Sequence, residues 1–430
     1  SRVMIIENAT TGSQSIAISQ GSGANVTILT GEVKMVYLDG AGSGAAVVDA
    51  LTDIGLSGTV TIAALNVTGN LDVDGTSTFD GITNAGNFET DGGTIKLDGN
   101  YPTGSSNVVL GNSALDSLDG SSPGGSNTAI GASALTANTT GSTNTAVGAL
   151  SLTANTTGSS NVAIGKDALA ANTTGEENVA VGKNALEANT TASDNTALGN
   201  AALLLNTTGT NNVAVGDRAL DANTTGDNLV AVGQLALSAN TTADNNTAVG
   251  KSALLLNTTG TLNTAVGSNA GDALTTGSYT TAVGSNALSA VTDENYNTAV
   301  GYNAAAATTG GGNTAIGGVA MANNTTGSSN TAVGRGALNA NTEGVDNTAV
   351  GRNALLTATT ADDNTAIGRS AMRLTTTGHS NTAVGYQALD KQTTANDNTA
   401  IGNNAFAALT TGVRNTAVGS DAGLSTTTAG

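Results

Sequence analysis

The chain has 430 residues, of which 58 are glycine, two are proline, one is histidine and none is cysteine or tryptophan. Aromatic residues make up 2% and charged residues 10%, whereas an ordinary globular domain has about 25% charged residues. This composition excludes a conventional large core and predicts a repetitive architecture of small side chains. The formal net charge of −19 argues against a nucleic-acid partner, because phosphate binding needs basic patches.

Targeting signals are not evident in the sequence. No apolar run approaches about 18 residues, so we expect no membrane insertion. The chain begins SRVMII, without an initiator methionine or a signal-peptide pattern. We therefore expect upstream residues to be missing or removed. The lack of cysteine leaves the redox compartment open.

The N-terminal part precedes any repeat. Residues 1–56 alternate short apolar runs with glycine turns, as in VMIIENATTGSQSIAIS, and are expected to form a small β-rich module. In residues 57–106, glycine interrupts the alternating runs every few residues. Such a segment has little core of its own, so we expect an intertwined β shaft built from several chains.

A repeat of about 17 residues fills residues 107–430. We define the marker glycine as the glycine that closes each NTAVG-like unit; it occurs in 19 copies, from Gly111 to Gly419. From Gly131 onward, sixteen intervals are 17 residues long and one, from Gly301 to Gly317, is 16. This period predicts an all-β solenoid or β-roll of 19 coils. At about 4.8 Å per coil, the rod would be roughly 90 Å long.

Three columns precede the marker glycine. The residue directly before it is aliphatic, the residue three before it is Thr or Val, and the residue between them is Ala in 18 of 19 copies. Because strand side chains alternate, we expect the Thr/Val and aliphatic columns to face the coil interior and the Ala column to face outward. Nothing larger than Ala stands in those 18 copies, which predicts a neighbouring chain against this face. The proposed interface of a homotrimer is Ala146, Ala163, Ala180 and Ala197.

A second apolar pair follows the marker glycine. Leu usually stands four residues after it and Ala or Leu six residues after it, which predicts a second short strand and a flattened two-strand roll. Turns with positive φ are expected at the marker glycine and at a second glycine such as Gly141. Asn138, Asn155 and Asn172 are expected to form a side-chain ladder at a corner. A single coil buries too little apolar surface to offset its ordering entropy, which again favours a homotrimer.

Several stretches resemble known fibre proteins. NTAVGYQAL (381–389) and the ANTTG runs resemble repeats of bacteriophage tail fibres of the marine and cyanophage type, and TGNLDVDGTSTFDG (68–81) resembles their shaft sequence. IIENATTGSQSIAIS followed by GEVKMVYLDGAG resembles a module near the start of such fibres. The NVAIG and NTAVG units also resemble head repeats of trimeric autotransporter adhesins, which are left-handed parallel β-rolls. The fibre resemblance covers nearly the whole chain.

The resemblance to tail fibres carries expectations about partners. It implies a virion-surface homotrimer, joined on its N-terminal side to a virion attachment protein and contacting a glycan or protein of the host cell surface. Fibres of this kind often end in a self-cleaving chaperone domain. None follows Gly430 in this sequence, so we expect it to have been released or to be lacking.

Most charged and aromatic residues of the repeat stand one or two positions after the marker glycine or just after the second glycine. One interpretation is a solvated surface that prevents sideways aggregation. The other is a contact stripe for a receptor, richer in basic and aromatic residues towards the C-terminus. The candidate receptor-contact residues are Tyr302, Arg335, Arg352, Arg369, Tyr386 and Gln387.

Catalytic and metal-binding patterns are weak. A single histidine, His379, cannot supply a Ser/His/Asp set, and we expect neither enzymatic activity nor a cofactor. A carboxylate-pair glycosidase stays formally open. Asp72-Val-Asp74-Gly75 lacks the third ligand and the closing Glu of a calcium loop, so no metal site is expected. The Asn-Thr-Thr triplets match the N-glycosylation pattern, but their column indicates a corner ladder.

The sequence thus predicts a structural virion fibre that forms an elongated trimeric shaft for host attachment. A bacterial trimeric surface adhesin is the alternative, and it should have a secretion signal upstream and a membrane anchor downstream. A third reading, a free ice- or glycan-binding solenoid, predicts a stable monomer.

Overall fold

The computed structural model describes residues 2–19, 25–38, 47–49, 106–118 and 124–428. The chain divides into two units, Ser1–Asp91 and Gly92–Gly430. All described secondary structure is β, and these residues hold no helix that could cross a membrane. The predicted shaft segment, 57–106, lies outside the described residues except for its last position.

The described residues of the first unit form five strands: β1 (Arg2–Glu7), β2 (Ile16–Ile18), β3 (Val26–Ile28), β4 (Val33–Leu38) and β5 (Val47–Asp49). β4 pairs antiparallel with β1 and β5, and β2 pairs antiparallel with β3. The buried Asn8 side chain joins two segments, because its Nδ2 donates to the Ile28 carbonyl at 2.9 Å and to the Gln14 carbonyl at 3.0 Å.

The second unit is a solenoid whose coils each contribute one three-residue strand. These strands are β6 (Val108–Leu110), β7 (Thr128–Ile130), β8 (Thr145–Val147), β9 (Val162–Ile164), β10 (Val179–Val181), β11 (Thr196–Leu198), β12 (Val213–Val215), β13 (Val230–Val232), β14 (Thr247–Val249), β15 (Thr264–Val266), β16 (Thr281–Val283), β17 (Thr298–Val300), β18 (Thr314–Ile316), β19 (Thr331–Val333), β20 (Thr348–Val350), β21 (Thr365–Ile367), β22 (Thr382–Val384), β23 (Thr399–Ile401) and β24 (Thr416–Val418).

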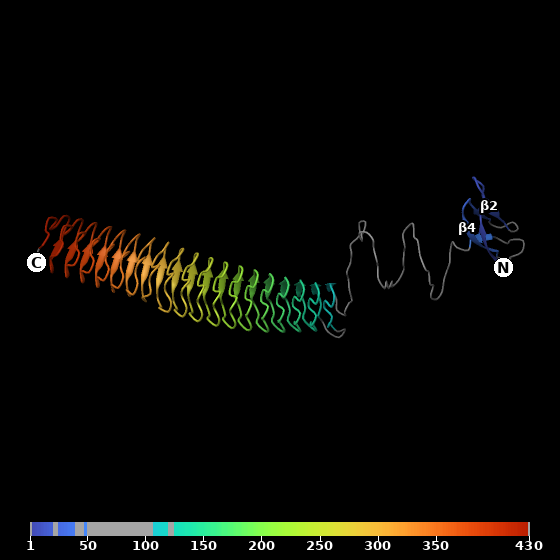
Figure 1. Ribbon diagram of the computed structural model, residues 1–430, viewed down its shortest axis with the longest axis horizontal. Coiled ribbons are helices and arrows are strands. Elements are labelled where there is room, and N and C mark those ends of the chain that lie inside the picture. Colours follow the sequence, from blue (N-terminus) through green and yellow to red (C-terminus); the bar gives the residue numbers. More distant parts are fainter. Residues whose placement is uncertain (1, 20–24, 39–46, 50–105, 119–123, 429–430) are drawn as a thin grey trace. The chain divides into compact units, whose positions relative to one another are not determined.

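Each strand pairs in parallel with the strand of the next coil, and equivalent residues stand opposite each other. Thus Ala180 pairs with Ala163 on one side and with Ala197 on the other. The 19 strands from β6 to β24 form one row along the solenoid and define 18 turns (Figure 1). The predicted β-solenoid of about 17-residue coils is confirmed.

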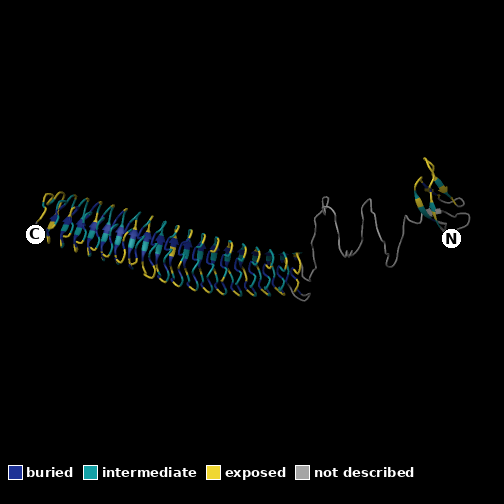
Figure 2. Cartoon of the chain, in the orientation of Figure 1, coloured by how far each residue is buried: buried dark blue, intermediate teal, exposed yellow. Residues whose placement is uncertain are grey.

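The predicted orientation of the strand columns is wrong. Ala146, Ala163, Ala180 and Ala197 are fully buried within a single chain, so they cannot form an interface with a neighbouring chain. The flanking Thr/Val and aliphatic residues are half-buried or exposed. Buried residues accordingly form a band along the solenoid, with exposed ones at its edges (Figure 2).

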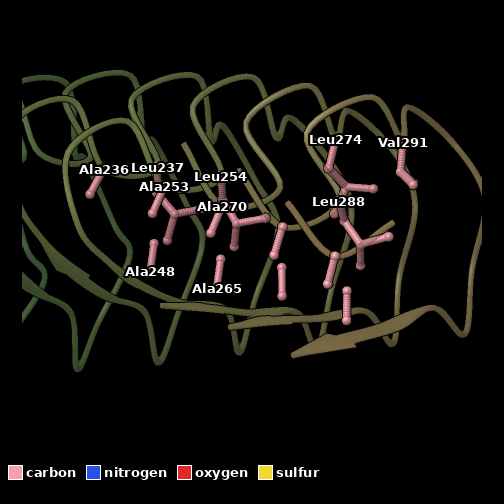
Figure 3. Packing of buried hydrophobic residues seen from close by; sticks show 14 of the residues in the cluster. Ala236, Leu237, Ala248, Ala253, Leu254, Ala265, Ala270, Leu274, Leu288 and Val291 are labelled. Carbon is pink, nitrogen blue, oxygen red and sulfur yellow. The ribbon is translucent and has the colours of Figure 1, made fainter. Parts of the chain in front are cut away.

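The interior explains why alanine is needed. Leucine side chains from the opposite wall, such as Leu237 and Leu254, point into the coil toward Ala248 and Ala265 of the strands (Figure 3). These leucines are at most 1% exposed. Close packing leaves little room for a second large side chain at the same level. Small residues on the strand and large ones on the wall therefore fill a narrow core.

The opposite wall is not the predicted second strand. Leu135 and Leu152 have positive φ, 53° and 49°, and lie in a continuous turn segment. The wall still bonds from coil to coil: the Leu135 N–H donates to the Ser151 carbonyl at 3.0 Å, and the Ala137 N–H to the Thr153 carbonyl at 3.1 Å. The left-handed backbone conformation of each leucine turns its side chain inward, and these hydrogen bonds hold the coils in register. The residue six after the marker glycine is only half-buried at Ala137, so the expected inward pair reduces to the leucine.

The two glycine columns differ. Marker glycines such as Gly216 have φ of +136°, and a Cβ there would overlap the backbone of Gly233 in the next coil. The second glycine, as at Gly226, does not have the predicted positive φ. Its small size matters because a Cβ would lie close to the next coil's carbonyl and to Asn223 Oδ1. Ala192 and Ala243 occupy this second column in other coils, so the backbone adjusts to a methyl group there.

The predicted asparagine ladder is present. Asn155 Nδ2 donates to Asn138 Oδ1 at 2.9 Å and to the Gly158 carbonyl at 2.9 Å, and Asn172 Nδ2 donates to Asn155 Oδ1 at 2.8 Å. These side chains are completely buried. The amide groups thus satisfy one another and the corner carbonyl, as buried polar groups must.

A second ladder was not predicted. In most coils the asparagine that begins the NTAVG-like unit is also buried, and its Oδ1 accepts the backbone N–H of the equivalent residue one coil later. For example, the Asn178 N–H donates to Asn161 Oδ1 at 3.0 Å, and Asn161 Nδ2 donates to the Gly175 carbonyl at 2.8 Å. The recurrence of Asn in this column is the sequence signal that identifies the second ladder.

Candidate functional site

The exposed positions after the marker glycine form a column along one corner of the solenoid. The turn at each marker glycine directs the following residue outward, and Arg335, Arg352 and Arg369 occupy this position in three successive coils. We call these three residues the arginine row. All three are exposed.

Hydrogen bonds between coils fix the backbone of the arginine row. The Arg335 carbonyl accepts the Asn353 N–H at 3.0 Å, and the Arg352 carbonyl accepts the Ser370 N–H at 3.0 Å. The Arg369 carbonyl accepts the Gln387 N–H at 3.1 Å. The three arginines are therefore held one coil apart, at about the 4.8 Å spacing of paired strands.

The charge of the arginine row is not neutralised by the protein. Within the described part of the chain, no carboxylate forms an ion pair with Arg335, Arg352 or Arg369. Nearby Arg373, by contrast, donates from Nε to Asp390 Oδ1 at 2.8 Å. Guanidinium groups at coil spacing repel each other by about 1 kcal/mol per adjacent pair in water. The row is thus a concentrated positive charge on a chain of net charge −19.

Of the other candidate residues, Tyr386 and Gln387 extend this surface and Tyr302 does not. Tyr386 follows Arg369 in the same column, and the Arg369 guanidinium carbon lies 5.6 Å from the centre of its ring, a cation–π contact. Gln387 is half-buried and lines a shallow hollow with Asp390 and Lys391. Tyr302 is 61% exposed but stands two coils before Arg335.

The coil between them has Gly318 in this column, which offers no side chain. The structure therefore brings together five of the six predicted contact residues and leaves Tyr302 apart.

An aliphatic column runs along the outer face of the strands and replaces the alanines as the candidate assembly surface. Its members stand directly before the marker glycines, and seven between β9 and β23 are 36–47% exposed: Ile164, Leu198, Val266, Val300, Ile316, Ile367 and Ile401. Together with the Thr/Val column beside it, this row is defined here as the sheet face. A row of partly exposed apolar side chains is a candidate interaction surface.

The structure also reveals an aromatic surface that the sequence-based reasoning missed. Tyr279 and Tyr296 stand in equivalent positions of successive coils, and their rings stack with centroids 5.2 Å apart at an angle of 8°. The next coil is the 16-residue one, and its residues Gly310–Gly312 line a hollow of about 590 Å³ together with Glu294 and Tyr296. The 17-residue spacing of the two tyrosines and the shortened interval were the signals available in the sequence.

Residues considered for catalysis or metal binding do not gather into a site. His379 is exposed, and its Nδ1 lies 3.2 Å from Ser380 Oγ. The described residues include no cluster of three or more His, Asp or Glu side chains that could share a metal ion. Asp72 and Asp74 lie outside those residues.

No protein-family model, curated protein or solved structure matches the chain.

Proposed function

We propose that this chain is the trimeric shaft of a virion fibre, which holds a host-binding surface at a distance from the particle. The observation that carries the proposal is the sheet face: a rigid row of parallel strands with half-exposed aliphatic side chains along the whole solenoid. Burying such a row against copies of itself stabilises an assembly in proportion to the apolar area removed from water. A trimer with three sheet faces turned inward would place the corner columns at its periphery.

The contrast between constant buried positions and variable exposed positions supports the proposal that the solenoid presents a binding surface. Buried positions keep the same residue types from coil to coil, whereas the exposed corner column changes and holds the arginine row. A solenoid of this kind encodes length through the number of coils and specificity through its variable columns.

Electron microscopy of virions labelled with antibodies against this chain tests the assignment. We expect label along slender fibres that leave the particle. The alternative, a bacterial trimeric adhesin, predicts label on the cell envelope of uninfected bacteria. Label in neither place would contradict both assignments.

A second candidate function follows from the same face. Thr and Val or Ile stand side by side on the outer surface of most strands, for example at Thr365 and Ile367 of β21. A regular array of threonine and aliphatic side chains is suited to ordering water at an ice surface. This function requires a free sheet face, so it predicts a monomer that lowers the freezing point of water below the melting point of ice.

A further inference from the structure

We infer that the arginine row binds a linear acidic polysaccharide that has one carboxylate per sugar unit. This inference rests on the proposed function, since it names the surface polymer that the fibre would contact. It is carried by three observations: the three arginines are exposed, they have no carboxylate partner among the described residues, and they are held in register by hydrogen bonds between coils.

The spacing of the row selects the shape of the ligand. Successive arginines stand one coil apart, at about 4.8 Å, which is close to the advance of one sugar unit in an extended polysaccharide. A straight polymer lying along the solenoid axis would therefore bring a regular series of carboxylates within reach of the three long guanidinium side chains. A guanidinium binds a carboxylate through two parallel N–H···O bonds, which adds geometric selectivity to the charge attraction.

Tyr386 extends the row by one further coil. Tyr386 is 39% exposed, and its ring contacts the Arg369 guanidinium. An exposed aromatic ring offers an apolar face, against which the C–H face of a sugar can pack. The column therefore presents three anion-binding groups followed by one aromatic ring against which a sugar can pack.

Other polyanions fit this surface less well. The chain has 32 acidic and 13 basic residues, so its overall field repels nucleic acid, whose binding needs extended basic surface. A folded acidic protein would present its carboxylates at irregular spacing. The straight, evenly spaced row favours a regular polymer of low charge density.

Binding of the full chain to immobilised polygalacturonate, a linear polyuronate, tests the inference. The matched ligand is the fully methyl-esterified polymer, which keeps the sugar backbone and removes the charge. We expect binding to the acid form only, and weakening by added salt because exposed charges are screened. Equal binding to the ester, no binding to the acid form at low salt, or equal displacement by single-stranded DNA would each overturn it.

A matched pair of variants locates the site. The triple variant Arg335→Gln, Arg352→Gln and Arg369→Gln should lose binding, and each single change should weaken it about tenfold. The control is Lys166→Gln, Lys183→Gln and Lys251→Gln, which removes three charges from the same corner column but not from three successive coils. All six positions are exposed, so both variants should keep the melting temperature of the unmodified chain. Equal binding by the two triple variants would sink the assignment of the site.

This experiment separates the ligand from the function. Polyuronate binding by a chain that labels no virion fibre would uphold the ligand and reject the fibre assignment. Fibre labelling combined with unchanged polyuronate binding by the arginine variant would uphold the fibre assignment and reject the arginine row as the binding site.

Discussion

At the residue scale, alanine recurs on the strands because the coil interior is too narrow for a larger side chain there. Ala180 is fully buried and lies between Ala163 and Ala197 of the neighbouring strands. Leucines such as Leu186 fill the space from the opposite wall. An added side chain on the strand has no cavity to enter.

We therefore expect Ala180→Leu to destabilise the solenoid. Overpacking a filled core costs about 1–3 kcal/mol. The control is Lys183→Leu, in the same coil but exposed, which should change stability by less than about 0.5 kcal/mol. Urea unfolding of both variants measures the difference, and equal stabilities would show that the alanine column is not packed as described.

The sequence predicted the alternation in these strands but not which side is inside. Period-two alternation shows that Ala and its neighbours face opposite ways. Assigning the larger aliphatic residues to the interior assumed that the strand supplies the core. Here the opposite wall supplies the core through leucines in the left-handed conformation. This conformation costs leucine about 1–2 kcal/mol, so residue propensities do not predict it.

Asp272 provides a test at the level of one titrating group. Burial raises the pKa of the Asp272 carboxyl, and its Oδ1 is buried without a hydrogen-bond partner. A raised pKa in the folded state means that folding favours the protonated form, so this group's contribution falls as pH rises from about 3.9.

Asp272→Asn should accordingly raise the melting temperature at pH 7 and have little effect at pH 3. The control is Asp221→Asn in the equivalent position of another coil, where Asp221 Oδ1 accepts a hydrogen bond from Ser238 Oγ at 2.6 Å. This control should give no gain at pH 7. A melting temperature of Asp272→Asn below that of the unmodified chain at pH 7 would contradict the account.

At the element scale, the two glycine columns require glycine for different reasons, one for its backbone conformation and the other for its small size. Gly216 requires positive φ and lies against the next coil, whereas Gly226 lies in a tight corner without positive φ. We expect Gly216→Ala to cost well over 1 kcal/mol, because alanine is strained at that φ and its methyl group meets backbone. Gly226→Ala should cost much less, since Ala243 fills the same position one coil later. Thermal unfolding ranks the two, and the reverse order would refute this distinction.

The coil length and its corners were predictable from sequence, while its second wall was not. The 17-residue period, the turn at the marker glycine and the ladder of Asn155 were all evident from recurrence. The wall around Leu152 has an apolar pattern that fits a strand equally well. Only its bonds to the next coil and its positive φ distinguish the observed turn.

The same contrast holds for the candidate site. The arginine row could be found in the sequence because its members recur at one column. The sequence does not show that these arginines lack carboxylate partners among the described residues. Pairing depends on which side chains of neighbouring coils come together in space, as Arg373 and Asp390 do. The hollow beside Tyr296 lies next to the coil that is one residue shorter, and the sequence shows the missing residue but not the hollow.

At the scale of the whole molecule, assembly through the sheet face is the property on which the fibre proposal depends. Replacing Ile164, Leu198 and Ile316 by lysine would place three charges within the proposed contact. Burying an unpaired charge costs several kcal/mol, so we expect this variant to be monomeric, whereas the unmodified chain is proposed to be a trimer. Its far-ultraviolet circular dichroism should be unchanged, because these side chains are 40–47% exposed in the single chain.

The matched control replaces Leu205, Leu256 and Leu262 by lysine. These leucines are 48–49% exposed but do not belong to the sheet face, so the control should remain trimeric. Sedimentation equilibrium gives the masses of all three proteins. Dissociation of the control but not of the sheet-face variant would move the interface away from the sheet face. A monomeric unmodified chain would remove the fibre proposal and favour a free solenoid, because only then does the array of threonine and aliphatic side chains stay open to solvent.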